Sequence, residues 1–191
     1  QSSRGSVFSV FGEEELNQIT EEGKRKVAVS CKINEPGIIE VPENATLNDI
    51  IDICGGILDK KKFKAAQLGI PFGGFLTEDS LDKVLDFDLF DKNSSRNIII
   101  LSEDDCIVQY ATFYVDYLIG RIEDSNKSEI YKKYSEVKEE VYRIWRVLDR
   151  ISKGRSNMRD VYLLRRLSGE IKDKLNQEHN IIQEIIGNFY E

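Results

Sequence analysis

Residues 97–120, NIIILSEDDCIVQYATFYVDYLIG, mark the point where this sequence changes from a strand pattern to a helix pattern. Residues 98–101 are β-branched or aliphatic, which is typical of a buried strand. Residues 102–105, SEDD, predict a helix start, because serine is a good N-cap and acids are favoured in the first turn. Apolar residues then recur at helical spacing, namely Ile107, Ala111, Tyr114, Val115 and Leu118. We therefore expect a β-type half before this stretch and a helical half after it.

The β-type half shows the pattern of a small sheet with one helix. The expected elements, in order, are strands at 26–34 and 38–41, a helix at 46–54, and strands at 63–70 and 97–102. Thr46 and Asp49 have the spacing of a capping box, which supports the helix start. This order of elements predicts a β-grasp, or ubiquitin-like, domain.

The loop PFGGFL brings Gly73 and Gly74 together between two of these segments. Paired glycines permit a positive φ or a close backbone approach. A phosphate-binding loop is disfavoured, because no Lys-Ser or Lys-Thr follows the glycines. We interpret Gly73 and Gly74 as a structural turn.

The second half shows three further amphipathic patterns at 129–153, 158–175 and 178–190. Together with the helix after residue 105, they predict an up-and-down four-helix bundle. The fold class is therefore α+β. Residues 1–25 show little patterning and are expected to form an arm or linker, with a short helix at 13–19.

Composition limits the classes of function. The chain has 191 residues, of which 40% are hydrophobic and 32% charged, as in an ordinary protein of one or two domains. The sequence shows neither a run of about 18 apolar residues nor a signal-peptide pattern, so we expect a cytoplasmic protein without membrane insertion. The net charge of −7 disfavours nucleic acid as the main partner.

The cysteines and the histidine do not form a recognisable site. Cys31, Cys54 and Cys106 are far apart, so neither a disulfide framework nor a Cys-x-x-Cys metal site is present. Each lies in an apolar pattern, which predicts reduced core residues. His179 has no partner at ligand spacing and is expected at the surface or at a helix end, rather than as a catalytic residue.

A basic stripe is the main candidate for a binding surface. Arg143, Arg146, Arg150 and Lys153 follow at i, i+3, i+7 and i+10, so they share one helix face. Acidic residues on the same helix favour a solvated, salt-bridged face. An acidic protein partner is the functional alternative, and nucleic acid is the least favoured.

Three stretches of the chain together resemble a known family. They are KINEPGIIEVPENATLNDIIDICGGI at 32–57, KKFKAAQLGIPFGGFL at 61–76 and the stretch at 98–120. In order and spacing they resemble the C-terminal half of the NADH-binding flavoprotein subunit of bacterial respiratory complex I. Related subunits of NAD(P)-dependent hydrogenases share this half. The resemblance covers residues 26–190, and its most specific part is KFKA-x-Q-x-G-x-P-x-GG.

The resemblance implies a soluble-ligand-binding β-grasp (SLBB) domain at 26–102 and a helical iron–sulfur-type domain at 103–191. In the family the helical domain carries a [4Fe–4S] cluster, and an upstream domain holds FMN and NAD. The run of cluster cysteines would fall near Glu123, Asn126 and Glu129, and the fourth cysteine within 175–180. None of these positions holds a cysteine, so the chain lacks the ligands of the cluster.

Three functions follow as expectations. The favoured one is a non-catalytic docking or scaffold module for a protein partner, such as subunits of a redox complex, with no cofactor in this chain. The second is a C-terminal fragment of an NADH:acceptor oxidoreductase, in which FMN and NAD bind an upstream domain. The third is a small-ligand-binding SLBB protein. The chain alone is not expected to be an enzyme.

Overall fold

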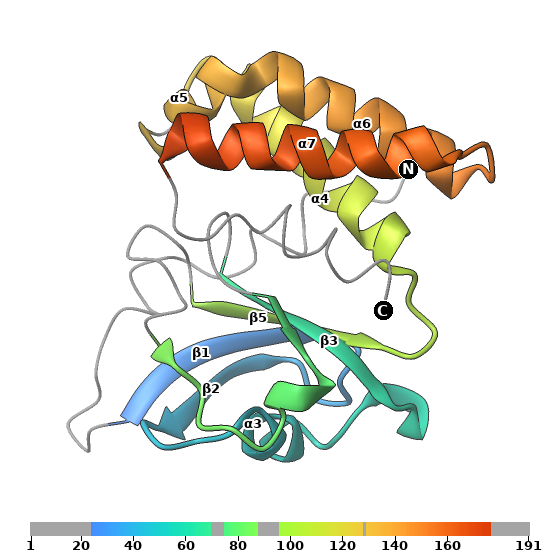
Figure 1. Cartoon of the computed structure of the whole chain (residues 1–191). Coiled ribbons are helices and arrows are strands. Elements are labelled where there is room, and N and C mark those ends of the chain that lie inside the picture. The colour runs from blue at the N-terminus through green and yellow to red at the C-terminus, as the bar shows by residue number, and fades with distance from the viewer. Residues whose placement is uncertain (1–23, 70–74, 88–95, 128, 177–191) are drawn as a thin grey trace. The chain divides into compact units, whose positions relative to one another are not determined.

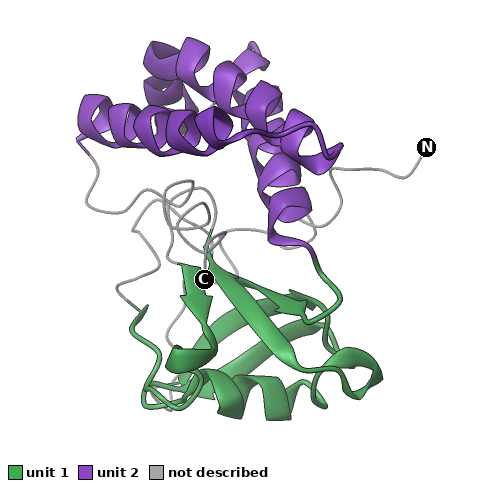
Figure 2. Ribbon diagram, turned by 45° about the vertical axis from the view of Figure 1, so that its right-hand side comes forward, with its two compact units in different colours: residues 1–105 green, residues 106–191 purple. Residues whose placement is uncertain are grey.

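The computed structural model describes residues 24–69, 75–87, 96–127 and 129–176. The chain divides into two compact units, Gln1–Asp105 and Cys106–Glu191, which Figure 2 colours separately. The first unit combines a mixed sheet with a helix and the second is helical, so the fold class is α+β, as predicted. No helix within the described ranges is long and apolar enough to cross a membrane.

The described part of the first unit contains a five-stranded sheet with the order β2-β1-β5-β3-β4 (Figure 1). Its strands are β1 (Lys24–Cys31), β2 (Gly37–Pro42), β3 (Phe63–Leu68), β4 (Phe75–Thr77) and β5 (Asn97–Ser102). β1 and β5 are parallel, while the other neighbouring pairs are antiparallel. Among the described strands, the last along the sequence thus lies next to the first.

One face of the sheet is covered by α3 (Leu47–Ile53). The helix begins at a capping box: Asp49 N donates to Thr46 Oγ1 at 3.1 Å, and Thr46 N donates to Asp49 Oδ2 at 2.9 Å. Both predicted partners of this cap are therefore confirmed. Leu47, Ile50 and Ile51 point inward and join a core with β1 and β5 residues such as Val29 and Ile100.

The strand predictions are largely confirmed, with one omission. β4 was not expected, because it is only three residues long and lies in an acidic, irregular stretch. It forms by antiparallel pairing with β3, in which Leu76 lies opposite Ala66. The neighbouring Gly73 and Gly74 lie outside the described residues, so their structural-turn interpretation stays a prediction.

The described part of the second unit contains α4 (Ile107–Glu123), α5 (Glu129–Tyr134), α6 (Lys138–Ser152) and α7 (Met158–Leu175). α6 packs against both α4 and α7. The bounds predicted for α7 are confirmed. The predicted helix at 178–190, His179, and the arm before residue 24 with its short helix lie outside the described residues.

The helix start predicted at residues 102–105 is wrong. α4 begins at Ile107 after Cys106, and its first turn holds no acid. β5 continues through Ser102, whose N–H donates to Asp105 Oδ2 at 2.8 Å, while Asp105 N donates to Ser102 O at 2.9 Å. The serine and the aspartate thus close a turn after the strand rather than cap the helix.

The single long helix predicted at 129–153 is also wrong. A 3-10 turn at Ser135–Val137 separates α5 from α6. Tyr131, Tyr134 and Val137 are three residues apart, and all are buried. A 3-10 turn has three residues per turn, so it keeps this spacing on one face better than a continuous α-helix would.

Candidate functional site

The connection between α4 and α5 holds the three positions where the resemblance places cluster cysteines. Glu123 ends α4, and its carboxylate accepts a hydrogen bond from the Tyr142 hydroxyl. Asn126 follows in a turn, where its N–H donates to Asp124 Oδ1 at 2.9 Å. Glu129 begins α5 and forms an ion pair with Lys132. These side chains and backbone groups thus support helix ends and a turn.

The residues of this connection do not fit a [4Fe–4S] cluster. Such a cluster is held by four thiolates, whereas carboxylate and amide oxygens suit harder metal ions. The whole sequence contains only three cysteines. Within the described ranges, no group of three or more His, Cys, Asp or Glu residues is placed to hold a metal ion.

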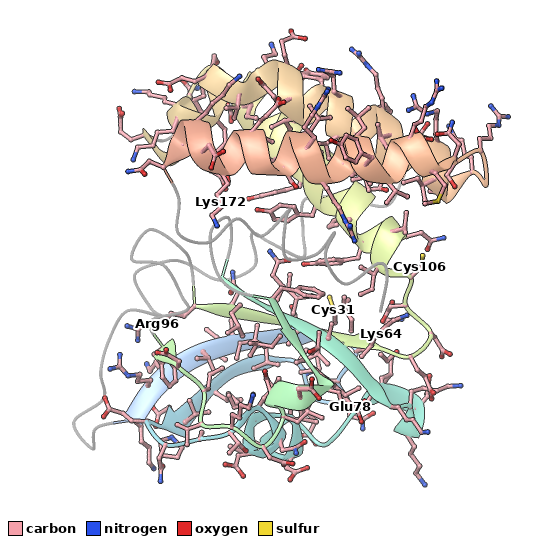
Figure 3. All side chains as sticks on the ribbon, viewed as in Figure 1. Cys31, Lys64, Glu78, Arg96, Cys106 and Lys172 are labelled. Atoms are coloured by element: carbon pink, nitrogen blue, oxygen red, sulfur yellow. The ribbon has the colours of Figure 1, made fainter. Side chains whose placement is uncertain are left out.

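The three cysteines occupy separate elements. Cys54 is fully buried in the core beside α3, as predicted, and burial raises the pKa of its thiol. The core prediction is wrong for Cys31 and Cys106, which are exposed (Figure 3). Cys31 ends β1 with a φ of 77°, where the chain leaves the sheet, and Cys106 is the residue before α4. Both residues lie at the end of an element, and an apolar sequence pattern alone does not reveal this.

Half of the predicted basic stripe on α6 is engaged within the chain. Arg150 Nη2 lies 2.5 Å from Asp160 Oδ1, and the arginine holds the pKa of this carboxyl below its usual range. Lys153 Nζ lies 2.8 Å from Asp149 Oδ2, one turn earlier. For Arg150 and Lys153, these contacts match the salt-bridged alternative.

Arg143 and Arg146 form the other half of the stripe. Both are exposed on α6. In the part of the chain that the structure describes, neither guanidinium has an ion-pair partner within 4.0 Å. The charge of Arg143 nevertheless acts within the chain, because it adds to the hydrogen bond from Lys174 in lowering the pKa of Glu140.

Further basic residues follow the stripe in the connection after α6 and in α7, and the sequence analysis did not count them. Residues 143–166, here named the basic hairpin, contain eight basic and two acidic residues, a net charge of +6 in a chain of net charge −7. Met158 and Tyr162 are 82% and 71% exposed and lie one turn apart on α7. Counting charge across both predicted helices, rather than along one face, would have revealed this region.

Tyrosines fill part of the core near α5. Tyr114 and Tyr134 are each 1% exposed, and Tyr131 is 6% exposed. Burial raises the pKa of Tyr114 and of Tyr131 well above the usual tyrosine value. Arg121 lies 5.0 Å from the centre of the Tyr131 ring. The phenols of Tyr114 and Tyr131 therefore stay protonated near neutral pH, so these two side chains act as packing groups rather than as bases.

The first unit matches a known domain family. Residues 26–80 agree with the family model of the SLBB domain. This part of the chain is an SLBB domain. The match covers β1 from Lys26 through β4 and ends before β5, although β5 lies between β1 and β3 in the sheet. The strand contributed by residues 97–102 thus completes the SLBB sheet from outside the matched range.

Relatives extend this similarity beyond the SLBB domain. The chain is 35% identical over 163 residues to the NADP-reducing hydrogenase subunit HndC of Solidesulfovibrio fructosivorans, covering 83% of this chain and 32% of the relative. It is 34% identical over 93 residues to the F subunit of the NADH-quinone oxidoreductase of Aquifex aeolicus (strain VF5), covering 47% of this chain and 21% of the relative. The same subunit of Escherichia coli (strain K12) is 34% identical over 82 residues, covering 42% and 18%. The chain is homologous to these subunits and spans about a third or less of their length.

Solved structures show the same fold. Two crystal structures of NAD⁺-reducing [NiFe]-hydrogenase, in the air-oxidized and H₂-reduced states, match with TM-scores of 0.62 and 0.65. They cover 88% and 97% of this chain, and the chain covers 29% and 31% of theirs. The sequence identities are 16% and 15%, so the likeness concerns the fold. These proteins therefore contain a region with the same fold as most of this chain.

Proposed function

We propose that this chain is a non-catalytic docking or scaffold module for a protein partner. In this proposal, a β-grasp SLBB domain at 26–102 is followed by a cluster-free four-helix bundle at 103–191. The observation that carries the proposal concerns Glu123, Asn126 and Glu129, near which the resemblance places the cluster cysteines. Glu123 accepts a side-chain hydrogen bond, Asn126 donates its backbone N–H within a turn, and Glu129 forms an ion pair. A helical unit that retains its packing but lacks these ligands is suited to binding rather than electron transfer.

The basic hairpin supports an acidic protein as the partner. Its net charge is +6, whereas the remainder of the chain carries −13, because the whole chain carries −7. Exposed Met158 and Tyr162 lie within it, and arginine, methionine and tyrosine are enriched in the centres of protein interfaces. A long nucleic acid is disfavoured, because the remaining charge would repel it. The relatives are named as subunits, so other subunits of a redox complex are the proposed partners.

Charge reversal with a matched control tests this proposal. Tagged chain would be purified from cells of its own organism, and co-purifying proteins would be quantified. The test variant carries Arg143→Glu and Arg146→Glu; the control carries Lys60→Glu and Lys62→Glu, which change the net charge equally at exposed positions of the first unit. We expect recovery of the partner to fall about tenfold or more in the test variant only. Equal recovery from the two variants would rule out the basic hairpin as the docking surface.

A second candidate is a part of a longer NADH:acceptor oxidoreductase. The short share of each relative that the chain covers, 32% of HndC and 18–21% of the two NADH-quinone oxidoreductase relatives, favours it. FMN and NAD would then bind residues of the longer protein outside this chain. Electron transfer would also have to bypass this helical unit, because its residues do not fit the cluster. The length of the coding sequence, and NADH oxidation by its full product, distinguish this candidate from the first.

A further inference from the structure

Two arginines from neighbouring strands lie at the same end of the sheet in the first unit. Arg25 is the second residue of β1, and Arg96 directly precedes β5, the parallel neighbour of β1. A hydrogen bond from Ala28 N to Arg96 O, at 3.0 Å, fixes this register. Side chains alternate along a strand, so Arg25 lies on the same face of the sheet as Val27, and Arg96 on the same face as Ile98. Val27 and Ile98 belong to the core that α3 covers. Figure 3 labels Arg96 at this end of the sheet.

Each of these arginines has a buried N–H group without an acceptor. Arg25 Nη2 forms an ion pair with Glu43 Oε1 at 3.0 Å, and the guanidinium lies 5.0 Å from the centre of the Phe87 ring. Arg25 Nε and Arg96 Nη1 are nevertheless buried with no hydrogen-bond partner among the residues described. Buried donors are nearly always paired in proteins, so two orphaned donors in neighbouring arginines indicate a missing acceptor.

The two positive charges also disfavour each other. Burial lowers the pKa of Arg96, and the nearby charge of Arg25 lowers it further. Glu43 offsets only part of this repulsion, because its side chain is 61% exposed and therefore well solvated. A bound anion would neutralise both guanidinium groups and accept from the orphaned donors.

An open hollow of about 400 Å³ lies beside Arg25. Its volume falls within the range of small-ligand sites. The lining consists of Arg25, Glu43, Val84, Leu85, Asp86 and Phe87. Val84 is 59% exposed and Phe87 carries the stacked guanidinium, so an apolar wall lies next to a cation. The carboxylates of Glu43 and Asp86 belong to the same lining.

We propose that Arg25 and Arg96 form an anion site for a small ligand with a carboxylate or phosphate group. The oxyanion accepts hydrogen bonds from the two guanidinium groups, while the apolar body of the ligand lies against Val84 and Phe87. Glu43 and Asp86 border the site, and Glu43 competes with the ligand for Arg25. This site is formed by β1 and by the residue before β5, the neighbouring strand. The proposal of an anion site therefore does not depend on the basic hairpin or on the proposed docking function.

An NMR titration of the full chain tests this site with two probes, inorganic phosphate and benzoate, at constant ionic strength. We expect saturable shifts of the Arg25 and Arg96 Nε–H signals and of the Phe87 amide. Arg96→Gln should weaken binding about tenfold or more, because one guanidinium is lost. Glu43→Gln should tighten binding, because it removes a competing carboxylate. Arg159→Gln, an exposed arginine in α7, is the control and should bind as the wild type does.

Each outcome decides for or against the site. Saturation by phosphate alone assigns a phosphate ligand, saturation by benzoate alone assigns a carboxylate, and saturation by both supports the shared oxyanion chemistry. If the NMR spectrum of R96Q shows that this variant does not fold, the variant R96K is used in its place. Lysine keeps the positive charge but lacks the paired donors of the guanidinium group, so R96K should also bind more weakly. An absence of saturable shifts in the wild type, up to about 20 mM of either probe, would overturn the proposal. Binding that is equally strong in the wild type and the Arg96 variant would overturn it as well.

Discussion

Arg150 Nη2 lies 2.5 Å from Asp160 Oδ1, so one ion pair joins the last turn of α6 to the first turn of α7. Asp160 also completes the cap of α7, because Asn157 N donates to Asp160 Oδ2 at 3.2 Å and Asp160 N donates to Asn157 Oδ1 at 3.2 Å. The aspartate is 4% exposed. A single buried carboxylate therefore stabilises the connection within the basic hairpin, and Arg150 has a structural role there.

Removing this carboxylate should destabilise the chain. Asp160→Ala removes the ion pair and one half of the capping box, so we expect a loss of about 1–2 kcal/mol in the free energy of unfolding. Asp149→Ala is the matched control, because Asp149 makes an ion pair with Lys153 within a single helix, and such pairs contribute about 0.3–0.5 kcal/mol. Urea unfolding of both variants measures the difference. Equal losses would contradict the role given to Asp160.

Acid should weaken the ion pairs that two carboxylates form with basic partners. Hydrogen bonds from Arg150 and Lys174 lower the pKa of Asp160 and of Glu140, respectively. A carboxylate with a depressed pKa in the folded state adds stability above its unfolded pKa of about 4. That stability is lost as the pH falls through the folded-state value. We therefore expect the free energy of unfolding to decrease below about pH 4.

The double variant Asp160→Asn, Glu140→Gln isolates this effect, because neither new side chain titrates. Its free energy of unfolding should fall less between pH 7 and pH 3 than that of the wild type. Denaturant unfolding at the two pH values measures both slopes. Parallel decreases in the two proteins would show that other groups cause the acid sensitivity.

Two positions on α7 should differ strongly in how much truncation costs in stability. Leu164 is fully buried, and Leu164→Ala should cost about 2–5 kcal/mol through lost burial and a cavity. Met158 is 82% exposed, and Met158→Ala should change stability by less than about 0.5 kcal/mol. Thermal unfolding distinguishes them. A large loss in Met158→Ala would mean that this side chain packs within the chain and is not part of an open surface.

The cysteines should differ in reactivity. Cys31 and Cys106 are exposed, whereas Cys54 is fully buried. Desolvation raises the thiol pKa of both Cys31 and Cys54, so exposure is what distinguishes these two thiols. We expect a maleimide to label Cys31 and Cys106 in the folded chain and Cys54 only after denaturation. Peptide mass spectrometry locates the labels. Rapid labelling of Cys54 under native conditions would contradict its place in the core.

Local patterns predicted the elements whose formation depends on nearby residues. The cap at Thr46 and Asp49 and the bounds of α7 agree with the structure, because capping groups and helical periodicity lie within a few residues. β4 could not be found in this way, since its three residues become a strand only by pairing with β3. The SEDD segment has the composition of a helix start, but Asp105 bonds Ser102 at the end of β5 instead.

The candidate sites were predictable to different degrees. The four members of the basic stripe followed from helical spacing, but spacing could not show that Asp160, from the next helix, would engage Arg150. The pair formed by Arg25 and Arg96 left no sequence signal, because these residues are far apart in the chain. They approach each other only through the parallel pairing of β1 with β5.

The central claim is that the helical unit folds without a [4Fe–4S] cluster. Measuring the iron and acid-labile sulfide content of the anaerobically purified chain tests this claim most directly. We predict substoichiometric iron and sulfide and no absorbance band near about 400 nm, since Glu123, Asn126 and Glu129 do not provide thiolates. Reconstitution with ferrous iron and sulfide under reducing conditions should not change this result. About four iron and four sulfide per chain, with that band, would contradict the cluster-free docking module.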